Sequence, residues 1–138
     1  AERSQKLAVH VSPSSLQVIA DRRYLERVLS ELINNACKYT PEDGNILVVV
    51  DKLSPKEVAF NVINDGPEIP ATELPHLFKK FYRAANATAS GQKGTGLGLA
   101  LVHNLVECMG GRILVRSEAQ ENSFCAIIPT GIALSAPT

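Results

Sequence analysis

The stretch ELINNACKYTP, from Glu31 to Pro41, decides the fold of this chain. It completes a longer run in which apolar residues recur with the 3.6-residue period of an amphipathic helix. We expect that helix to have Asp21 as its N-cap, to reach about Tyr39 and to be stopped by the turn sequence TPEDG. On its polar face four residues share a sector about 100° wide. They are Glu31, Asn34, Asn35 and Lys38.

Two consecutive asparagines in the middle of a helix need a reason, because asparagine is a poor helix former. A solvated helix face more often carries Glu and Lys pairs. Carboxamide oxygens are hard neutral ligands that suit hydrated Mg²⁺, and the ammonium of Lys38 beside them suits phosphate. This face therefore predicts a site for a phosphate compound and its metal ion.

Glycines mark a second candidate element, the segment GTGLGL from Gly94 to Leu99, which opens another predicted helix. Glycines let the backbone approach an anion closely, and the free amides and positive dipole end of the helix bind phosphate. No GK[ST] follows, so this is not a P-loop. A polar loop, Ala84 to Lys93, precedes it instead of a strand, so it is not a dinucleotide fingerprint either, and we expect that loop to be mobile.

A third element, NDGPEIP from Asn64 to Pro70, follows directly on a predicted strand. Gly66 and two prolines make it a rigid corner. It is either a plain tight turn or the floor of a pocket, with one acceptor directed at an adenine amino group and Ile69 against the base.

The other apolar runs predict strands that pair into hairpins, separated by helices. The strands are expected at 7–11, 16–20, 46–50, 58–63, 113–116 and 124–128, with a short helix at 72–81. This order predicts an α+β fold: a two-layer sandwich in which a mixed, mostly antiparallel sheet carries helices on one face. We expect a single domain over 1–138, with a core at about 7–129 and a loose tail at 130–138.

Composition excludes several classes of partner. The 138 residues include 14 Lys and Arg and 14 Asp and Glu, so the net charge is zero and neither nucleic acid nor direct membrane contact is expected. No apolar run approaches the roughly 18 residues of a membrane span. Three widely spaced cysteines are expected to be reduced and mostly buried, and they do not form a zinc motif.

Four motifs, in this order, resemble those of the ATP-binding catalytic domain of sensor histidine kinases, whose superfamily includes type II topoisomerases and mismatch-repair ATPases. They are ELINNACKYTP (N box, 31–41), NDGPEIP (first Gly box, 64–70), LFKKFYR (F box, 77–83) and KGTGLGLAL (second Gly box, 93–101). The resemblance spans about Ala20 to Pro129 and implies the Bergerat fold, the cofactors ATP and Mg²⁺, and activity as a protein-histidine kinase.

The resemblance also implies a role for each site residue. Asn35, the last asparagine of the N box, would ligate Mg²⁺, while Lys38 and Tyr39 would face the phosphates and the ribose or base. Arg83 could reach the γ-phosphate, and Ala84 to Lys93 would be the lid over the nucleotide. The amides of the second Gly box would hold phosphate oxygens. They belong to Gly94, Thr95, Gly96, Leu97, Gly98 and Leu99.

Two positions depart from the family pattern. The first Gly box usually reads DxGxG, and here the Asp that accepts from the adenine amino group is replaced by Asn64 and the second Gly by Glu68. Asn64 can still accept through its carbonyl oxygen, with binding weaker by about 1 kcal/mol, and Asp65 is the alternative acceptor. Glu31 stands where many histidine kinases have Asn. It could act as a general base, orient the phosphoacceptor His, or pair with Lys38 or Arg27.

None of the three histidines stands in the phosphoacceptor pattern of the family, so the substrate His is expected on a dimerising helical hairpin that lies N-terminal to this domain in the family. The chain would then be a cytoplasmic fragment of a longer kinase, monomeric alone and dimeric in full length, that passes the phosphoryl group to an Asp of a response regulator receiver domain. Two alternatives stay open: a free-standing serine kinase of the anti-sigma-factor type, and a nucleotide-gated interaction module with little catalysis.

Overall fold

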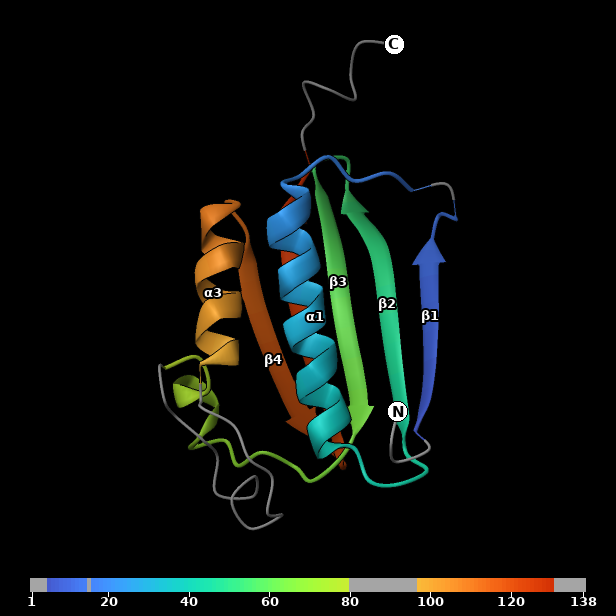
Figure 1. Cartoon of the computed structure of the whole chain (residues 1–138), viewed down its shortest axis with the longest axis vertical. Coiled ribbons are helices and arrows are strands. Elements are labelled where there is room, and N and C mark those ends of the chain that lie inside the picture. Colours follow the sequence, from blue (N-terminus) through green and yellow to red (C-terminus); the bar gives the residue numbers. More distant parts are fainter. Residues whose placement is uncertain (1–4, 15, 80–96, 131–138) are drawn as a thin grey trace.

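The computed structural model describes residues 5–14, 16–79 and 97–130. A five-stranded sheet, in the order β1-β2-β3-β5-β4, carries helices α1 and α3 on one face (Figure 1). The elements are β1 (Lys6–Ser12), α1 (Arg22–Tyr39), β2 (Asn45–Ser54), β3 (Glu57–Asp65), a 3-10 turn (Leu74–His76), α3 (Gly98–Cys108), β4 (Arg112–Glu118) and β5 (Glu121–Pro129). The predicted two-layer α+β sandwich is confirmed.

The sheet is mixed, because β1 runs parallel to β2 while the β2–β3, β3–β5 and β4–β5 pairs are antiparallel. The two later hairpins were predicted correctly. The predicted strand at 16–20 is wrong: this segment is irregular, turns at Pro13, whose carbonyl accepts from the Leu16 amide, and is fixed when the Ile19 amide donates to Thr130 Oγ1 at 3.2 Å. Its apolar side chains cover the end of the core instead of extending the sheet.

The predicted helix at 72–81 shrinks to the single turn Leu74–His76 among the described residues, and 80–81 lie outside them. Successive i→i+3 hydrogen bonds build it, from the Glu73 amide to the Pro70 carbonyl and from the His76 amide to the Glu73 carbonyl. The next hydrogen bonds, from the Leu77 amide to the Leu74 carbonyl and from the Lys79 amide to the His76 carbonyl, have the same i→i+3 spacing, so no α-helix forms over the described residues of this segment.

Helix α1 begins and ends where the sequence predicts. The side chain of Asp21 accepts from the Tyr24 amide at 3.1 Å, and Thr40 follows the last helical residue. The helix packs against the sheet on one side and against the neighbouring helix α3 on another (Figure 1), so its most buried residues are Val28, Leu32 and Ala36, at 0–2% exposure. Opposite them stand the helix-facing residues of the sheet and of α3, which form one core; these include Val58, Phe60, Val62, Val102, Val106, Phe124 and Ile128.

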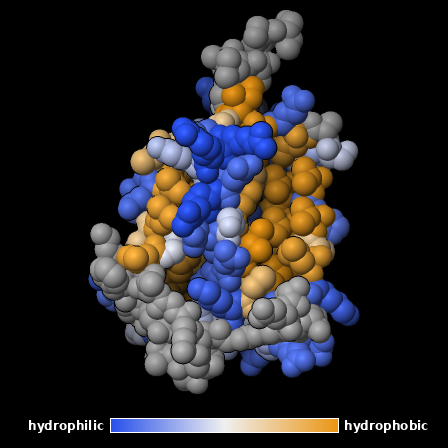
Figure 2. Space-filling model, viewed as in Figure 1, coloured by the Kyte–Doolittle hydropathy of each residue, from blue (hydrophilic) through white to orange (hydrophobic). Residues whose placement is uncertain are grey.

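The helices leave one edge of this sheet face uncovered. Leu7, Val9 and Val11 of β1 are register partners of Ile46, Val48 and Val50, which lie in or against the core, yet they are 42–59% exposed. Figure 2 shows apolar surface beside α1 on this side of the molecule. The three cysteines are free thiols, but the prediction that they are mostly buried is wrong: Cys108 is exposed and the other two are half-buried. Within the described ranges, no helix is both long and apolar enough to span a membrane.

Candidate functional site

Three segments that are distant in the sequence meet at one end of the two layers, where α1 and β3 end and α3 begins (Figure 1). Glycines make the approach possible. A Cβ atom on Gly66 would lie 2.9 Å from the carbonyl oxygen of Tyr39, the last residue of α1. A Cβ atom on Gly98 would lie 2.7 Å from Oε1 of Glu31. The first Gly box therefore packs against the end of the N box, and the second Gly box against its first residue.

The polar face of α1 divides into two environments. Glu31, which Gly98 approaches, and Asn35 are half-buried, whereas Asn34 and Lys38 are exposed. Glu31 Oε2 accepts from Arg27 Nε at 2.9 Å, so the ion pair with Arg27, one of the three roles considered for Glu31, is present. The carboxamide of Asn35 makes no hydrogen bond within the described ranges and is thus available to a ligand.

Asn64 forms a buried polar floor at the end of β3. Its side chain is on the helix-facing side of the sheet, with the residue 3% exposed, and Nδ2 donates to the Asp65 carbonyl at 2.9 Å. Its Oδ1 has no hydrogen-bond partner within 5–14, 16–79 and 97–130. An unpartnered buried acceptor costs about 1–3 kcal/mol. A ligand that donates a hydrogen bond to this oxygen would remove that cost.

The Asp65 carboxylate is already engaged elsewhere. Its Oδ2 accepts from the backbone amide of Asn45 at 2.8 Å and from Asn45 Nδ2 at 3.1 Å, which joins the end of β3 to the start of β2. Because side chains alternate along a strand, Asp65 points to the other side of the sheet from Asn64. The geometry therefore favours Asn64 over Asp65 as the acceptor at this site.

Two further polar residues, Ser117 and Asn122, were not predicted from the sequence. Asn122 is 4% exposed and is the register partner of Asn64 in β3 and of Ser117 in β4. The hydroxyl of Ser117 donates to Asn122 Oδ1. The alternation of β4 and β5 contained the signal, because both residues fall at inward-facing positions where their strands otherwise carry Ile113, Val115 and Phe124. A polar residue at such a position needs a buried partner.

The remaining predicted residues divide between the described and undescribed parts of the chain. Ile69 is 9% exposed and belongs to the core, Tyr39 and Leu99 are half-buried, and Leu97 is 38% exposed at the start of α3. Arg83, Gly94, Thr95 and Gly96 lie outside the described residues, as does the predicted lid from Ala84 to Lys93.

The donor set fits a nucleotide with a loosely held metal ion. No group of three or more His, Cys, Asp and Glu that could hold a metal exists among the described residues, so a closed protein cage is absent there. A magnesium ion would rely on the neutral oxygen of Asn35, on phosphate oxygens and on water, which is how Mg²⁺ is usually held beside phosphates. Asn64 Oδ1 would serve the base, and the N-terminus of α3 would serve the phosphates.

This fold and this arrangement of side chains define the chain as a nucleotide-binding domain of the ATPase class. It belongs to the family described as histidine kinase-, DNA gyrase B-, and HSP90-like ATPases, whose model matches residues 20–132. The resemblance to the ATP-binding catalytic domain of sensor histidine kinases is thereby confirmed, together with the Bergerat fold.

Similar proteins and solved structures support the same family assignment. The sensor protein CreC of Escherichia coli K12 is 34% identical over 122 residues, which is 88% of this chain and 25% of CreC. Full-length ShkA, solved in complex with AMPPNP, is 30% identical with a TM-score of 0.82 over 94% of this chain and 26% of that one. The histidine kinase ThkA, solved with the response regulator protein TrrA, is 25% identical with a TM-score of 0.78 over 96% of this chain and 36% of that one. The chain thus spans about a quarter of CreC.

Proposed function

We propose that this domain binds Mg·ATP at the end of the sheet where α1 ends and α3 begins, and presents the γ-phosphate to a histidine of the same kinase. The buried, unpartnered Oδ1 of Asn64 is the observation that carries the proposal. It is an acceptor with no protein donor in the described part of the chain, at the point where the family motifs meet. A purine amino group supplies the missing donor.

Each described site residue then has one task. Asn64 accepts from the adenine amino group, Gly66 keeps the corner close to Tyr39, and Ile69 packs against the base. Asn35 offers its carboxamide oxygen to Mg²⁺, and Lys38 offers positive charge at the exposed edge of α1. The amides at Leu97 and Gly98, where α3 begins, receive phosphate oxygens. We assign Arg83 and Gly94 to Gly96 to the phosphates as well, on the motifs alone.

Positioning and electrostatics supply most of the catalysis in phosphoryl transfer. The metal ion, when bound, neutralises phosphate charge. The residues of this chain hold the triphosphate so that its γ-phosphorus is open to in-line attack by an imidazole nitrogen. The Glu31 carboxylate lies beside the start of α3, where its Oε1 is 2.7 Å from the position that a Cβ on Gly98 would take. Once the ion pair with Arg27 opens, the Glu31 carboxylate can receive the proton of an incoming nucleophile or orient the phosphoacceptor histidine.

We place the phosphoacceptor histidine on a dimerising helical hairpin outside this chain, and the receiver domain of a response regulator downstream. The complex of ThkA with TrrA supports the second partner. The same proposal has the domain monomeric by itself, dimeric within the full-length kinase and exposed to ATP in the cytoplasm.

Titration calorimetry with a non-hydrolysable ATP analogue, with and without Mg²⁺, tests the proposal. We expect saturable binding that Mg²⁺ strengthens, and we expect Asn35→Ala to remove the strengthening. Asn34→Ala is the matched control, because it deletes the neighbouring carboxamide on the exposed side of the same helix. Absence of binding at about 1 mM analogue, which means less than about 4 kcal/mol of affinity, would leave an interaction module as the function.

Phosphotransfer needs a second measurement. A reconstituted kinase containing this domain should label itself from ATP, and Asn35→Ala or Asn35→Asp should abolish the labelling. The phosphate should be lost in acid, as phosphohistidine is. An acid-stable product would identify a serine kinase instead.

A further inference from the structure

The corner that follows β3 is held by the β4–β5 hairpin through three hydrogen bonds. The Gly66 amide donates to the Gln120 carbonyl at 3.0 Å, in the turn between β4 and β5. Asn122 Nδ2 donates to the Pro67 carbonyl at 3.1 Å, and the Ile69 amide donates to Ser117 Oγ at 2.7 Å. Two of the three bonds thus come from side chains.

These two side chains act as one unit. Ser117 and Asn122 are register partners, and the Ser117 hydroxyl donates to Asn122 Oδ1. That bond fixes which end of the Asn122 carboxamide faces the corner, so Nδ2 is presented to Pro67. The Ser117 hydroxyl oxygen also accepts from the Ile69 amide. Pro67 and Ile69, both in the corner, are therefore bonded to the Ser117–Asn122 pair. Asn122 is 4% exposed, which keeps water from replacing these bonds.

The corner in turn orients Asn64. An asparagine can present either its oxygen or its NH₂ group to a ligand, unlike the Asp that the family pattern has here. In this chain Nδ2 of Asn64 donates to the carbonyl of Asp65, the residue just before Gly66, and Oδ1 is left for the ligand. Asn122 Nδ2 and Asn64 Nδ2 both lie near Gly66, at 3.4 and 3.1 Å from where its Cβ would be. A displaced corner would move the Asp65 carbonyl and release the Asn64 amide to turn over.

We propose that Asn122, oriented by Ser117, is a positioning residue that fixes the corner from Gly66 to Ile69, keeps Asn64 Oδ1 toward the ligand, and so makes the site select a 6-amino purine over a 6-oxo purine. The inference rests on the proposed nucleotide site. A 6-amino group donates to Oδ1, whereas a 6-oxo group confronts it with a second acceptor. A site that leaves a buried group unpaired rejects the ligand.

The experiment compares magnesium complexes of ADP and inosine diphosphate, whose bases carry an amino and an oxo group at the 6-position, by titration calorimetry on this chain. The variants are Asn122→Ala and Ser117→Ala. The matched control is Asn61→Ala, because Asn61 Oδ1 accepts from Ser123 Oγ at 2.6 Å across the same two strands. That pair lies on the face of the sheet opposite Asn64 and Asn122.

We expect the unmodified chain to bind ADP at least about tenfold more tightly than inosine diphosphate. Asn122→Ala should weaken ADP binding about five- to tenfold and leave inosine diphosphate nearly unchanged, so the preference narrows. Ser117→Ala should also reduce the preference for ADP, but by a smaller factor. In the double variant the preference should fall by less than the product of the two single-variant factors, because the two residues act together. Asn61→Ala should keep the preference of the unmodified chain.

The preference between the two diphosphates separates positioning from a merely structural role, because general loosening of the fold weakens both ligands alike. Circular dichroism melts identify the variants that fold. If Asn122→Ala does not fold, the inference is decided by Ser117→Ala, which removes only one hydroxyl. A folded variant that weakens neither ligand selectively overturns the inference but leaves the proposed function intact. Failure of the unmodified chain to bind either diphosphate overturns the proposed function itself.

Discussion

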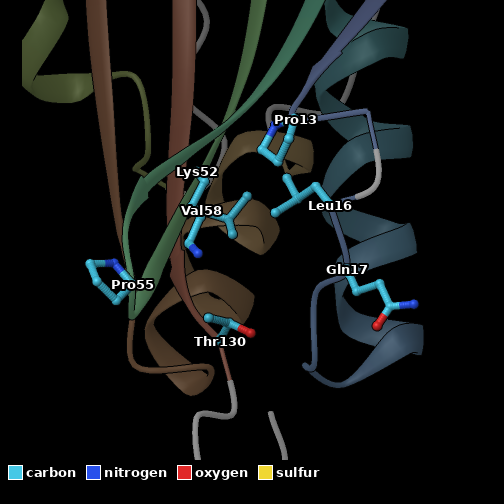
Figure 3. Close-up of a pocket in the computed structure, with 7 residues that line it drawn as sticks. All are labelled: Pro13, Leu16, Gln17, Lys52, Pro55, Val58 and Thr130. Atoms are coloured by element: carbon cyan, nitrogen blue, oxygen red, sulfur yellow. The ribbon is translucent and has the colours of Figure 1, made fainter. Parts of the chain in front are cut away.

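The two ends of the helix–sheet sandwich differ in what they bury. Where α1 ends and α3 begins, the helix-facing side of the sheet ends in Asn64 and Asn122, both at most 4% exposed. At the other end, Val58, the second residue of β3, is 1% exposed. There the structure is hollowed between the chain before α1 and the β2–β3 turn, with Leu16, Pro55 and Val58 among the lining residues (Figure 3). The end with Asn64 and Asn122 thus buries polar atoms at a cost in stability, whereas the end with Val58 is apolar, as protein cores usually are.

Exchanging the chemistry of the two ends should produce the largest effect. Val58 and Asn64 are on the same face of the same strand. Val58→Asn places a carboxamide in the core without a partner, so we expect the free energy of unfolding in urea to fall by about 2–3 kcal/mol. Asn64→Leu removes a buried acceptor that has no partner in the described part of the chain, so stability should fall by less than about 1 kcal/mol while nucleotide binding is lost.

Equal destabilisation by Val58→Asn and Asn64→Leu would contradict the proposed difference between the two ends of the sheet. That result would mean that Asn64 is an ordinary structural asparagine. Calorimetric titration of Asn64→Leu with the ATP analogue supplies the second readout, and retained affinity would also contradict its role as the acceptor.

Glycines at the two ends should sharpen the same contrast with a smaller effect. Gly66→Ala brings a Cβ to 2.9 Å from the Tyr39 carbonyl, so the corner must move, and we expect about tenfold weaker nucleotide binding. Gly110 has φ 79° after α3, where an added Cβ meets only Pro129 Cγ at 3.5 Å. Gly110→Ala should therefore lower the unfolding free energy by about 1–2 kcal/mol through backbone strain and leave binding unchanged. Urea unfolding and titration of both variants measure the two effects, and a loss of binding in Gly110→Ala would contradict the assignment.

The sequence predicted what local patterns encode. The period of α1, its N-cap at Asp21 and the later hairpins depend on residues close in the chain, and all are confirmed. The parallel pairing of β1 with β2 was missed because it depends on a crossover through α1, which no turn signal marks. The segment 16–20 has the apolar character of a strand but uses it to cover the core.

The motifs of the candidate site could be recognised in the sequence, but the residues that hold its corner in place could not. Asn35, Asn64 and Gly66 stand in recognisable patterns, and the structure brings their segments together at one end of the sheet. Ser117 and Asn122 belong to none of those patterns. We infer their role from hydrogen bonds to Pro67 and Ile69, about fifty residues away, which only the folded register brings within reach.

The smallest expected effect concerns the thiols. Burial raises the pKa of the Cys125 thiol on the open face of the sheet; Arg112 opposes the shift, and Asp51 adds to it. Cys108 is exposed at the end of α3. Since the thiolate is the nucleophile, we expect iodoacetamide near pH 8 to modify Cys108 first and Cys125 last, as mass spectrometry of time points will show.

The same shift gives a sign for the dependence of stability on pH. The folded domain holds the Cys125 proton more tightly than the unfolded chain, so this contribution is complete below the ordinary thiol pKa of about 8.5 and is lost as pH rises through the raised value. Unfolding free energy should therefore decline more steeply above about pH 9 in the unmodified chain than in Cys125→Ala. Equal slopes for the two proteins, or modification of Cys125 as fast as Cys108, would show that the open face of the sheet does not bury this thiol. The contrast in burial between that face and the side chain of Asn64 would then be larger than the structure indicates.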